Sequence, residues 1–189
     1  MDAALVPDPD QVTLNVDGLP GGGRDGIELR DGTQVQVRPV TVNDSAALLR
    51  FHQHLSPETI RRRYFSAHPQ LTEGEVERFT TVDHHDREAL VAIVDSEIIG
   101  VARYERTMAP TDAEVAFVIA DVWQRHGLGT ALLDRLTTRA RDEDVRRLVA
   151  ETLSENRGML EVFSRAGFVL AGSWDHGVGL WVRTLDSTS

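Results

Sequence analysis

Hydrophobic and polar residues alternate in several stretches of the chain, and this alternation predicts β-strands. The first clear case is 34–39, where Val35, Val37 and Pro39 alternate with polar neighbours. Pro39 is expected near the end of this strand, because proline cannot donate to a sheet. Further apolar or β-branched runs predict six more strands, at 89–94, 98–104, 113–119, 148–153, 168–171 and 178–182. The short segment 95–97 predicts a hairpin between the first two of these.

Apolar residues spaced at about 3.6 positions predict the helices. Asn43 or Asp44 is expected to cap the first helix, whose apolar stripe is Ala46, Ala47, Leu48, Phe51 and Leu55. Ser56-Pro57-Glu58 predicts the start of a second helix, and the capping box at 72–75 the start of a third. Two more helices are predicted later in the chain, one that begins after Gly129 and one at 156–165. This order of elements predicts an α/β fold with a mixed central sheet flanked by helices, in a single domain.

The charge is distributed unevenly between the ends of the chain. The 189 residues carry a net charge of -10, with 30 acidic and 20 basic side chains. Residues 1–32 hold seven acids and two arginines, which is half of that net charge, together with three prolines and the run Gly21-Gly22-Gly23. This composition predicts a flexible acidic leader at 1–26, a folded domain at 27–185 and a short tail at 186–189.

Composition also excludes several classes of function. The chain has no cysteine, which rules out disulfides, thiolate metal sites and a cysteine nucleophile. His84 and His85 are flanked by acids, but adjacent side chains on a strand point apart, so we expect no metal site. The acidic balance argues against nucleic-acid binding. There is no apolar run long enough for a membrane span and no signal-peptide pattern, so a cytoplasmic protein is expected. The oligomeric state is not evident from the sequence.

One stretch carries recognisable chemistry. The predicted strand that ends at Ile119 is followed by a glycine-containing turn, 124–130, and then by a helix. Such a turn leaves several main-chain N–H groups unpaired at the start of the helix, where the helix dipole adds positive charge. Gly127 and Gly129 would let the main chain approach a phosphate closely, so the turn predicts an anion-binding site.

The residues that are missing narrow the choice of anion. A phosphate-binding loop of the nucleotide hydrolases ends in Gly-Lys-Ser/Thr, whereas this turn ends in Gly129-Thr130 and the chain contains no lysine. A dinucleotide-binding motif would need a small residue where Leu132 stands and would open the first βαβ unit. A Gly-x-Gly turn by itself is equally consistent with a simple helix start.

The surrounding sequence extends the argument. The stretch 124–129 after a strand, with Asn156 and Gly167-Phe168 downstream, resembles the pyrophosphate-binding motif of the GNAT acyltransferases, Gln/Arg-x-x-Gly-x-Gly/Ala. The resemblance covers about residues 33–183. Within that family the chain looks most similar to the bacterial protein lysine acetyltransferases that modify acyl-CoA synthetases, on stretches 29–33, 55–59, 83–88 and 151–157.

The resemblance implies acetyl-CoA as cosubstrate and no metal. The pyrophosphate would lie on the turn, and the pantetheine would pair with the main chain of Val118 and Ile119, where an N–H of Val118 or its neighbour could meet the oxyanion. Asn156 would either bind the pantetheine or cap the following helix. The cofactor-binding residues implied in this way are Val118, Ile119, Gln124, Arg125, His126, Gly127, Leu128, Gly129, Thr130 and Asn156.

The resemblance also implies a general base, Glu114. It lies four residues before Val118, which places both side chains on one face of a regular strand. A base is needed because a lysine amine has a pKa of about 10.4. With no cysteine in the chain, direct attack of the amine in a ternary complex is expected. Phe163 stands where many family members have a tyrosine acid, so either water protonates the leaving thiolate or it leaves unassisted.

Several questions about the acceptor stay open. The resemblance implies an acceptor protein, such as an acyl-CoA synthetase; alternatives are a small amine, a protein N-terminus, or a noncatalytic acyl-CoA sensor, which would not need Glu114. The run Arg61-Arg62-Arg63 is expected to form a solvated helix face, although it could contact an acidic protein surface or the 3′-phosphate of CoA.

Overall fold

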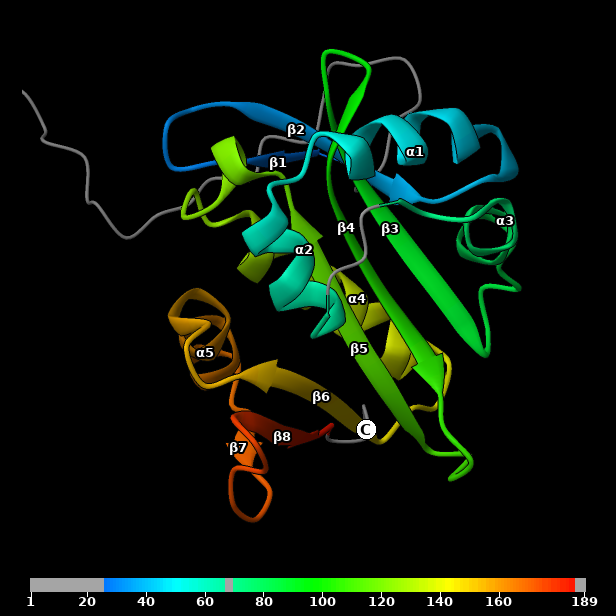
Figure 1. The fold of residues 1–189 in the computed structure, drawn as a ribbon. Helices are drawn as coiled ribbons and strands as arrows, with labels where there is room; N and C mark the ends of the chain where they lie inside the picture. The colour runs from blue at the N-terminus through cyan, green and yellow to red at the C-terminus, as the bar shows by residue number, and fades with distance from the viewer. Residues whose placement is uncertain (1–25, 67–69, 186–189) are drawn as a thin grey trace, which may run out of the picture.

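The computed structural model describes residues 26–66 and 70–185, so the predicted leader (up to residue 25) and tail (186–189) lie outside the described residues. An eight-stranded sheet forms the centre of the protein, in the order β1-β2-β3-β4-β5-β6-β8-β7 (Figure 1). Its strands are β1 (Gly26–Glu28), β2 (Gln34–Pro39), β3 (Arg87–Val94), β4 (Glu97–Arg106), β5 (Asp112–Ile119), β6 (Arg147–Leu153), β7 (Val169–Leu170) and β8 (Val178–Thr184).

The sheet is mixed, as predicted. All neighbouring strands are antiparallel except β5 and β6, which are parallel. The hairpin between β3 and β4 is tighter than expected, because only Asp95 and Ser96 connect the strands, both with positive φ (49° and 67°). β1 was not predicted, since its three residues lie in a stretch rich in glycine and acids. It pairs with β2, Gly26 opposite Gln36.

Within residues 26–66 and 70–185, five α-helices and two short 3₁₀ segments surround the sheet. The helices are α1 (Ser45–Gln53), α2 (Pro57–Tyr64), α3 (Glu73–Thr80), α4 (Leu128–Asp142) and α5 (Arg157–Arg165), and the 3₁₀ segments are η1 (Val42–Asp44) and η2 (Asp121–Trp123). Ser56 caps α2, and Thr72 and Glu75 form the predicted capping box of α3. Asp44 is the N-cap residue of α1, but its carboxylate binds the Arg38 guanidinium (2.7 Å) instead of the helix.

The helices cover both faces of the sheet and enclose two hydrophobic cores. α4 lies behind the sheet in Figure 1, where its leucines pack on β4 and β5, whereas α1, α2 and α3 lie in front. Residues of β5 alternate between the two sides. Val115 and Phe117 face the α4 core, and Ala116 and Val118 face the side of α1 to α3. These layers confirm the predicted single-domain α/β fold and define what lies on each face of β5.

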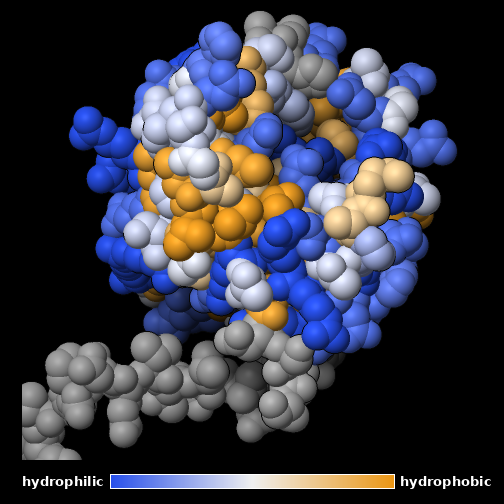
Figure 2. All heavy atoms as spheres, turned by 90° about the horizontal axis from the view of Figure 1, so that it is seen from below, coloured by the Kyte–Doolittle hydropathy of each residue, from blue (hydrophilic) through white to orange (hydrophobic). Residues whose placement is uncertain are grey.

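The C-terminal strands carry exposed hydrophobic residues. Val169 in β7, Trp174 in the connection and Leu180 in β8 are all exposed. Figure 2 views the molecule from below, the side on which β7 and β8 lie in Figure 1, and shows hydrophobic side chains gathered on part of that face. No helix in the described ranges is long and apolar enough to cross a membrane.

Candidate active site

β5 and β6 are paired along only part of their length. Asp112, Ala113 and Glu114 pair with Arg147, Leu148 and Val149, and the strands then diverge (Figure 1). A cavity of about 780 Å³ opens where they separate, walled by β5, β6, α2, α5 and the start of α4. This volume is typical of a site for a small molecule or cofactor. Of the predicted site residues, those lining it are Glu114, Val118, Ile119, Gln124, Arg125, Gly127, Gly129, Thr130 and Asn156.

The register of β5 shows which main-chain groups face the cavity. The N–H of Ala120 donates to the carbonyl of Ile99 (2.9 Å), and pairing with β4 continues without a bulge. In an antiparallel ladder, hydrogen-bonded positions alternate. The main-chain groups of Val118 therefore point toward β4, and those of Phe117 and Ile119 point toward the open edge. Val118 lines the cavity with its side chain. The main-chain groups that could pair with the amides of a ligand are therefore those of Phe117 and Ile119.

The turn between β5 and α4 has the conformation of an anion-binding site. Gly127 adopts φ of 91° and caps α4, and Arg125 also has a positive φ of 68°. The carbonyl of Gly127 accepts from the N–H of Ala131 (3.1 Å), which is the start of the helical bonding. The N–H groups of the first helical turn, 128–130, consequently have no partner within the helix and carry the positive end of its dipole.

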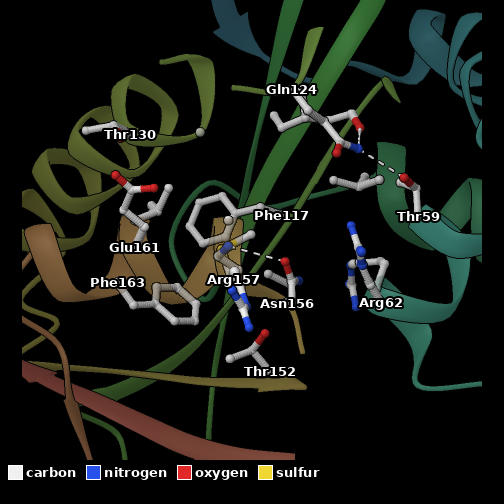
Figure 3. A pocket seen from close by; sticks show the side chains of 18 of the residues that line it. Thr59, Arg62, Phe117, Gln124, Thr130, Thr152, Asn156, Arg157, Glu161 and Phe163 are labelled. Atoms are coloured by element: carbon white, nitrogen blue, oxygen red, sulfur yellow. Dashed lines mark hydrogen bonds between the residues drawn. The ribbon is translucent and has the colours of Figure 1, made fainter. Parts of the chain in front are cut away.

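Side chains of the turn hold it against α2. The Nε2 of Gln124 donates to the Thr59 hydroxyl (3.0 Å) and to the Ile119 carbonyl (3.1 Å), so the role of this side chain is to position the turn (Figure 3). Asp121 accepts hydrogen bonds from the Ser56 N–H (2.9 Å) and the Thr59 hydroxyl (2.7 Å). Desolvation raises the pKa of Asp121, but these hydrogen bonds outweigh it and the net pKa is lowered.

Two predicted ligand residues are absent from the cavity wall. The His126 side chain contacts the Asp31 carboxylate instead (Nδ1 to Oδ2, 3.0 Å). The pKa of Asp31 is lowered to about 2, mainly by hydrogen bonds from Thr33 and further by His126. The Leu128 side chain is fully buried in the α4 core, which leaves only its main chain for a ligand. The side chains of His126 and Leu128 therefore hold the turn in place from the side that faces away from the cavity.

Asn156 is the N-cap of α5. Its Oδ1 accepts from the N–H of Met159 (3.2 Å), which is the capping alternative of the sequence analysis (Figure 3). Its side chain also lines the cavity, so the amide NH₂ remains available to donate there. Capping and ligand binding are therefore compatible for this residue.

Glu114 is exposed and lies at the point where β5 and β6 diverge. It pairs with Val149 of β6 on one side and with Glu105 of β4 on the other. Because β5 is regular, Glu114 lies on the same face as Ala116 and Val118, as predicted. Glu105 is bound by Arg78, whereas Glu114 is open to the cavity. A carboxylate in this place can accept a proton from a bound group.

The cavity wall is richer in arginine than the sequence analysis expected, which named Arg125 and gave the run 61–63 only as an alternative. Six guanidinium groups line it, those of Arg30, Arg62, Arg63, Arg125, Arg157 and Arg165. The prediction that Arg61 to Arg63 form a solvated helix face is wrong for Arg63, which lines the cavity and is largely desolvated, whereas Arg62 lines the cavity and stays partly exposed (36% of its side chain). Arg61 forms ion pairs with Glu58 and Glu155, and Arg62 also forms an ion pair with Glu58 (2.8 Å). This concentration of positive charge suits a ligand with several phosphates.

Phe163 has no acidic proton, and its ring belongs to an aromatic cluster. Its ring is buried among Phe117, Phe168 and Trp181, with the closest ring centroid, that of Phe168, at 4.9 Å. It still lines the cavity, so an apolar edge faces the space where a hydroxyl would stand. Thr152 on β6 lies nearby on the wall, buried, and within the described part of the chain its hydroxyl has no hydrogen-bond partner.

Histidines and acids elsewhere are used for internal contacts. His84 contacts the buried Glu88 (2.9 Å), and His85 contacts Glu143 (2.6 Å). The hydrogen bond with Glu143 is the main cause of a raised pKa at His85. Over residues 26–66 and 70–185, no group of three or more potential metal ligands occurs.

A cavity along an open strand edge, ending at a glycine turn and a helix N-terminus, is therefore the candidate active site. Residues 34–169 match the family described as acetyltransferase (GNAT) domain. The chain therefore belongs to the GNAT acetyltransferases, and the resemblance found in the sequence is confirmed.

Individual relatives agree with this assignment. The chain is 31% identical to acetyltransferase Pat of Mycolicibacterium smegmatis over 146 residues, which are 76% of this chain and 44% of that protein. It thus spans less than half of that relative's length. The structure resembles the GNAT domain of S. lividans PAT, with a TM-score of 0.80, 36% identity, and coverage of 85% of this chain and 96% of that domain.

A more distant structural neighbour was solved with a ligand. This is a GNAT phosphinothricin acetyltransferase from Sinorhizobium meliloti in complex with acetyl-CoA. Its TM-score is 0.67 at 19% identity, over 80% of this chain and 88% of that one. At this identity the likeness concerns the fold.

Proposed function

We propose that this protein transfers the acetyl group of acetyl-CoA to a lysine side chain of an acceptor protein, such as an acyl-CoA synthetase. The observation that carries the proposal is the layout of the cavity. An anion-binding turn lies at one end of the open edge of β5, and a carboxylate, Glu114, lies at the other end. Family membership and the complex of the Sinorhizobium meliloti relative support acetyl-CoA as the acetyl donor.

The residues of the wall fit the parts of acetyl-CoA. The N–H groups of 128–130 and the guanidinium of Arg125 would bind the pyrophosphate, and other arginines of the wall would bind the remaining phosphate. The N–H groups of Phe117 and Ile119 and the carbonyl of Phe117 would pair with the amides of the pantetheine arm. The Asn156 NH₂ group would donate to the same arm.

The chemical step needs a base, and we assign this role to Glu114. Freeing a lysine amine at neutral pH costs about 4 kcal/mol, since its pKa of about 10.4 lies roughly three units higher. The Glu114 carboxylate would take the proton, directly or through water, as the amine attacks the thioester carbonyl in a ternary complex. An N–H at the open edge of β5 would stabilise the oxyanion. Phe163 provides no proton, so the thiolate would leave unassisted or take a proton from water.

The experiment that tests this proposal uses purified protein, radiolabelled acetyl-CoA and a bacterial lysate that contains acyl-CoA synthetases. We expect label on a protein of the size of an acyl-CoA synthetase, at a lysine identified by mass spectrometry, and labelling at least about a hundredfold slower with Glu114→Gln. Because the chain has no lysine, it contributes no labelled side chain of its own. Label confined to small molecules would favour a small-amine acetyltransferase, and acetyl-CoA binding without any transfer would favour a sensor.

A further inference from the structure

A second, smaller hollow adjoins the acetyl-CoA cavity on the side of α1 to α3. Its volume is about 40 Å³, and Arg63, Ala116, Phe117 and Val118 line both spaces. We call it the arginine recess, because two arginines, Arg63 of α2 and Arg103 of β4, form part of its wall. It lies along the face of β5 that carries Glu114, so a group bound in it would lie close to the proposed base.

Small neighbours on the sheet make room for Arg103. In the register it stands between Ala89 of β3 and Ala116 of β5, and all three side chains share one face. Its guanidinium carbon lies 4.1 Å from the centre of the Phe79 ring, and that of Arg63 lies 5.0 Å from the centre of the Tyr64 ring. The aromatic rings position both guanidinium groups without using their N–H donors.

The two arginines lack a bound acid. Across the described residues, neither Arg63 nor Arg103 forms a hydrogen bond or an ion pair with a carboxylate, although Glu114 attracts Arg63 and Glu105 attracts Arg103 over a longer distance. Burial lowers the pKa of both groups, that of Arg103 to about 10, and repulsion from Arg63 adds to the effect at Arg103. Two like charges in a partly desolvated place are unfavourable unless an anion joins them.

We propose that Arg63 and Arg103 bind a carboxylate of the acceptor, next to the amine that Glu114 deprotonates. The inference rests on the proposed function for the amine and adds a specificity for acidic acceptors. A carboxylate fits because it accepts bidentate hydrogen bonds from guanidinium and is small enough for the recess. Its two possible sources are an Asp or Glu side chain near the target lysine of a protein and the α-carboxylate of a free amino acid.

The test compares acceptors that differ only in this charge. One arm uses fluorescent peptides with a single lysine and either Glu or Gln at each of three positions before and after it. The other arm uses free lysine and lysinamide. We expect the best Glu peptide to bind about tenfold more tightly than its Gln counterpart, and its kcat/KM for acetylation to be about tenfold higher. This factor corresponds to one charge-assisted hydrogen bond.

Variants of the recess identify the residues responsible. Arg103→Met should remove the preference for Glu over Gln and leave transfer to the Gln peptide nearly unchanged, because Arg103 lines only the recess. Arg63→Met should also remove the preference, but Arg63 lines the larger cavity as well, so this variant is judged by the ratio of transfer to Glu and Gln peptides alone. Arg50→Met is the matched control, because Arg50 is an exposed arginine of α1 that pairs with Glu97 and lines neither space. Circular dichroism melts establish that each variant is folded.

The outcomes separate this inference from the proposed function. A preference for lysine over lysinamide, without one among peptides, would assign the recess to a free amino acid. Equal binding of Glu and Gln peptides, with equal use of lysine and lysinamide, would overturn the inference even if acetyl transfer is efficient. Tighter binding of the Glu peptide without any transfer would support the recess and refute the acetyltransferase.

Discussion

The two ends of the cavity are built in different ways. At the α4 end, main-chain N–H groups of consecutive residues, 127–130, form the binding surface, and a left-handed glycine sets their direction. At the α2 end, side chains from separate elements do so, with Arg63 from α2, Arg103 from β4 and Glu114 from β5. In the proposed function, the first arrangement would bind the pyrophosphate with groups that are close in sequence, whereas the second depends on which side chains the fold brings together. Pyrophosphate binding by the turn would thus depend mainly on local structure, and acceptor choice on tertiary structure.

Glu114→Gln should have the largest effect, and it should change turnover without changing acetyl-CoA binding at the other end of the cavity. A general base contributes about 10² to 10⁴ in rate, so turnover should fall by that factor while acetyl-CoA affinity stays the same. Steady-state kinetics and calorimetric titration with acetyl-CoA measure the two effects. Glu105→Gln is the control, because Glu105 stands opposite Glu114 in the sheet but is bound by Arg78. Full turnover in Glu114→Gln would remove this residue from the mechanism.

Gly127→Ala should affect only the α4 end of the cavity, where the turn would bind acetyl-CoA. A Cβ in the left-handed conformation costs about 1 to 2 kcal/mol. The turn is expected to shift in response, raising the KM for acetyl-CoA about tenfold with little change in kcat. Gly74→Ala is a suitable control, since Gly74 lies in α3, has an ordinary φ and has open space around its Cβ position. A loss of kcat at unchanged KM would contradict the division between the two ends.

Asp121→Ala should weaken the contact between η2, near the α4 end of the cavity, and the start of α2 at the other end. It removes the acceptor for Ser56 and Thr59, and we expect a loss of about 1 kcal/mol in unfolding free energy, small because the carboxylate is exposed. Since the pKa of Asp121 is lowered in the folded state, its contribution is complete above about pH 5, about one unit above the pKa of an unfolded Asp. The contribution disappears as the pH falls through the lower folded pKa.

Urea denaturation of the wild type and the variant from pH 7 to pH 3 measures this dependence. The difference in unfolding free energy should stay constant down to about pH 5 and shrink at lower pH. A difference that grows on acidification would show that the sign of the pKa shift at Asp121 is wrong.

Phe163→Tyr should have the smallest effect. The new hydroxyl would restore the tyrosine that many family members have, but a thiolate leaves readily without a proton, so kcat should change by no more than about threefold. The pH dependence of kcat is the sensitive measurement, together with a melting curve to check that the aromatic cluster around Phe163 tolerates the hydroxyl. A tenfold gain would show that thiolate protonation limits the reaction.

Much of the fold could be predicted because its signals are local. Alternation predicted the strand 34–39 to the residue, and the capping box at Thr72 marked the start of α3. The anion-binding turn was also predictable, because glycine conformation and a helix start lie within one short stretch. β1 has only three residues, too few for a pattern, and it forms because β2 offers a pairing edge.

The rest of the site depends on contacts between distant parts of the chain. Arg62 and Arg63 line the cavity because Asp121 anchors the start of α2, and the bonded residues are 62 and 65 positions apart. Similarly, Arg103 becomes part of a recess through its register with Ala116, and His126 turns away because Asp31 is in reach. Hydrophobic periodicity carries no information about such pairs.

The divergence of β5 from β6 has a consequence for hydrogen exchange. Along 116–119, every second amide hydrogen is bonded to β4 and the others face the open edge, where the described residues provide no strand partner. In the free protein, the amide of Val118 should therefore exchange slowly with deuterium, and those of Phe117 and Ile119 much faster. Acetyl-CoA should slow these two and remove the alternation, so a short peptide of β5 would report on occupancy of the site without any measurement of turnover.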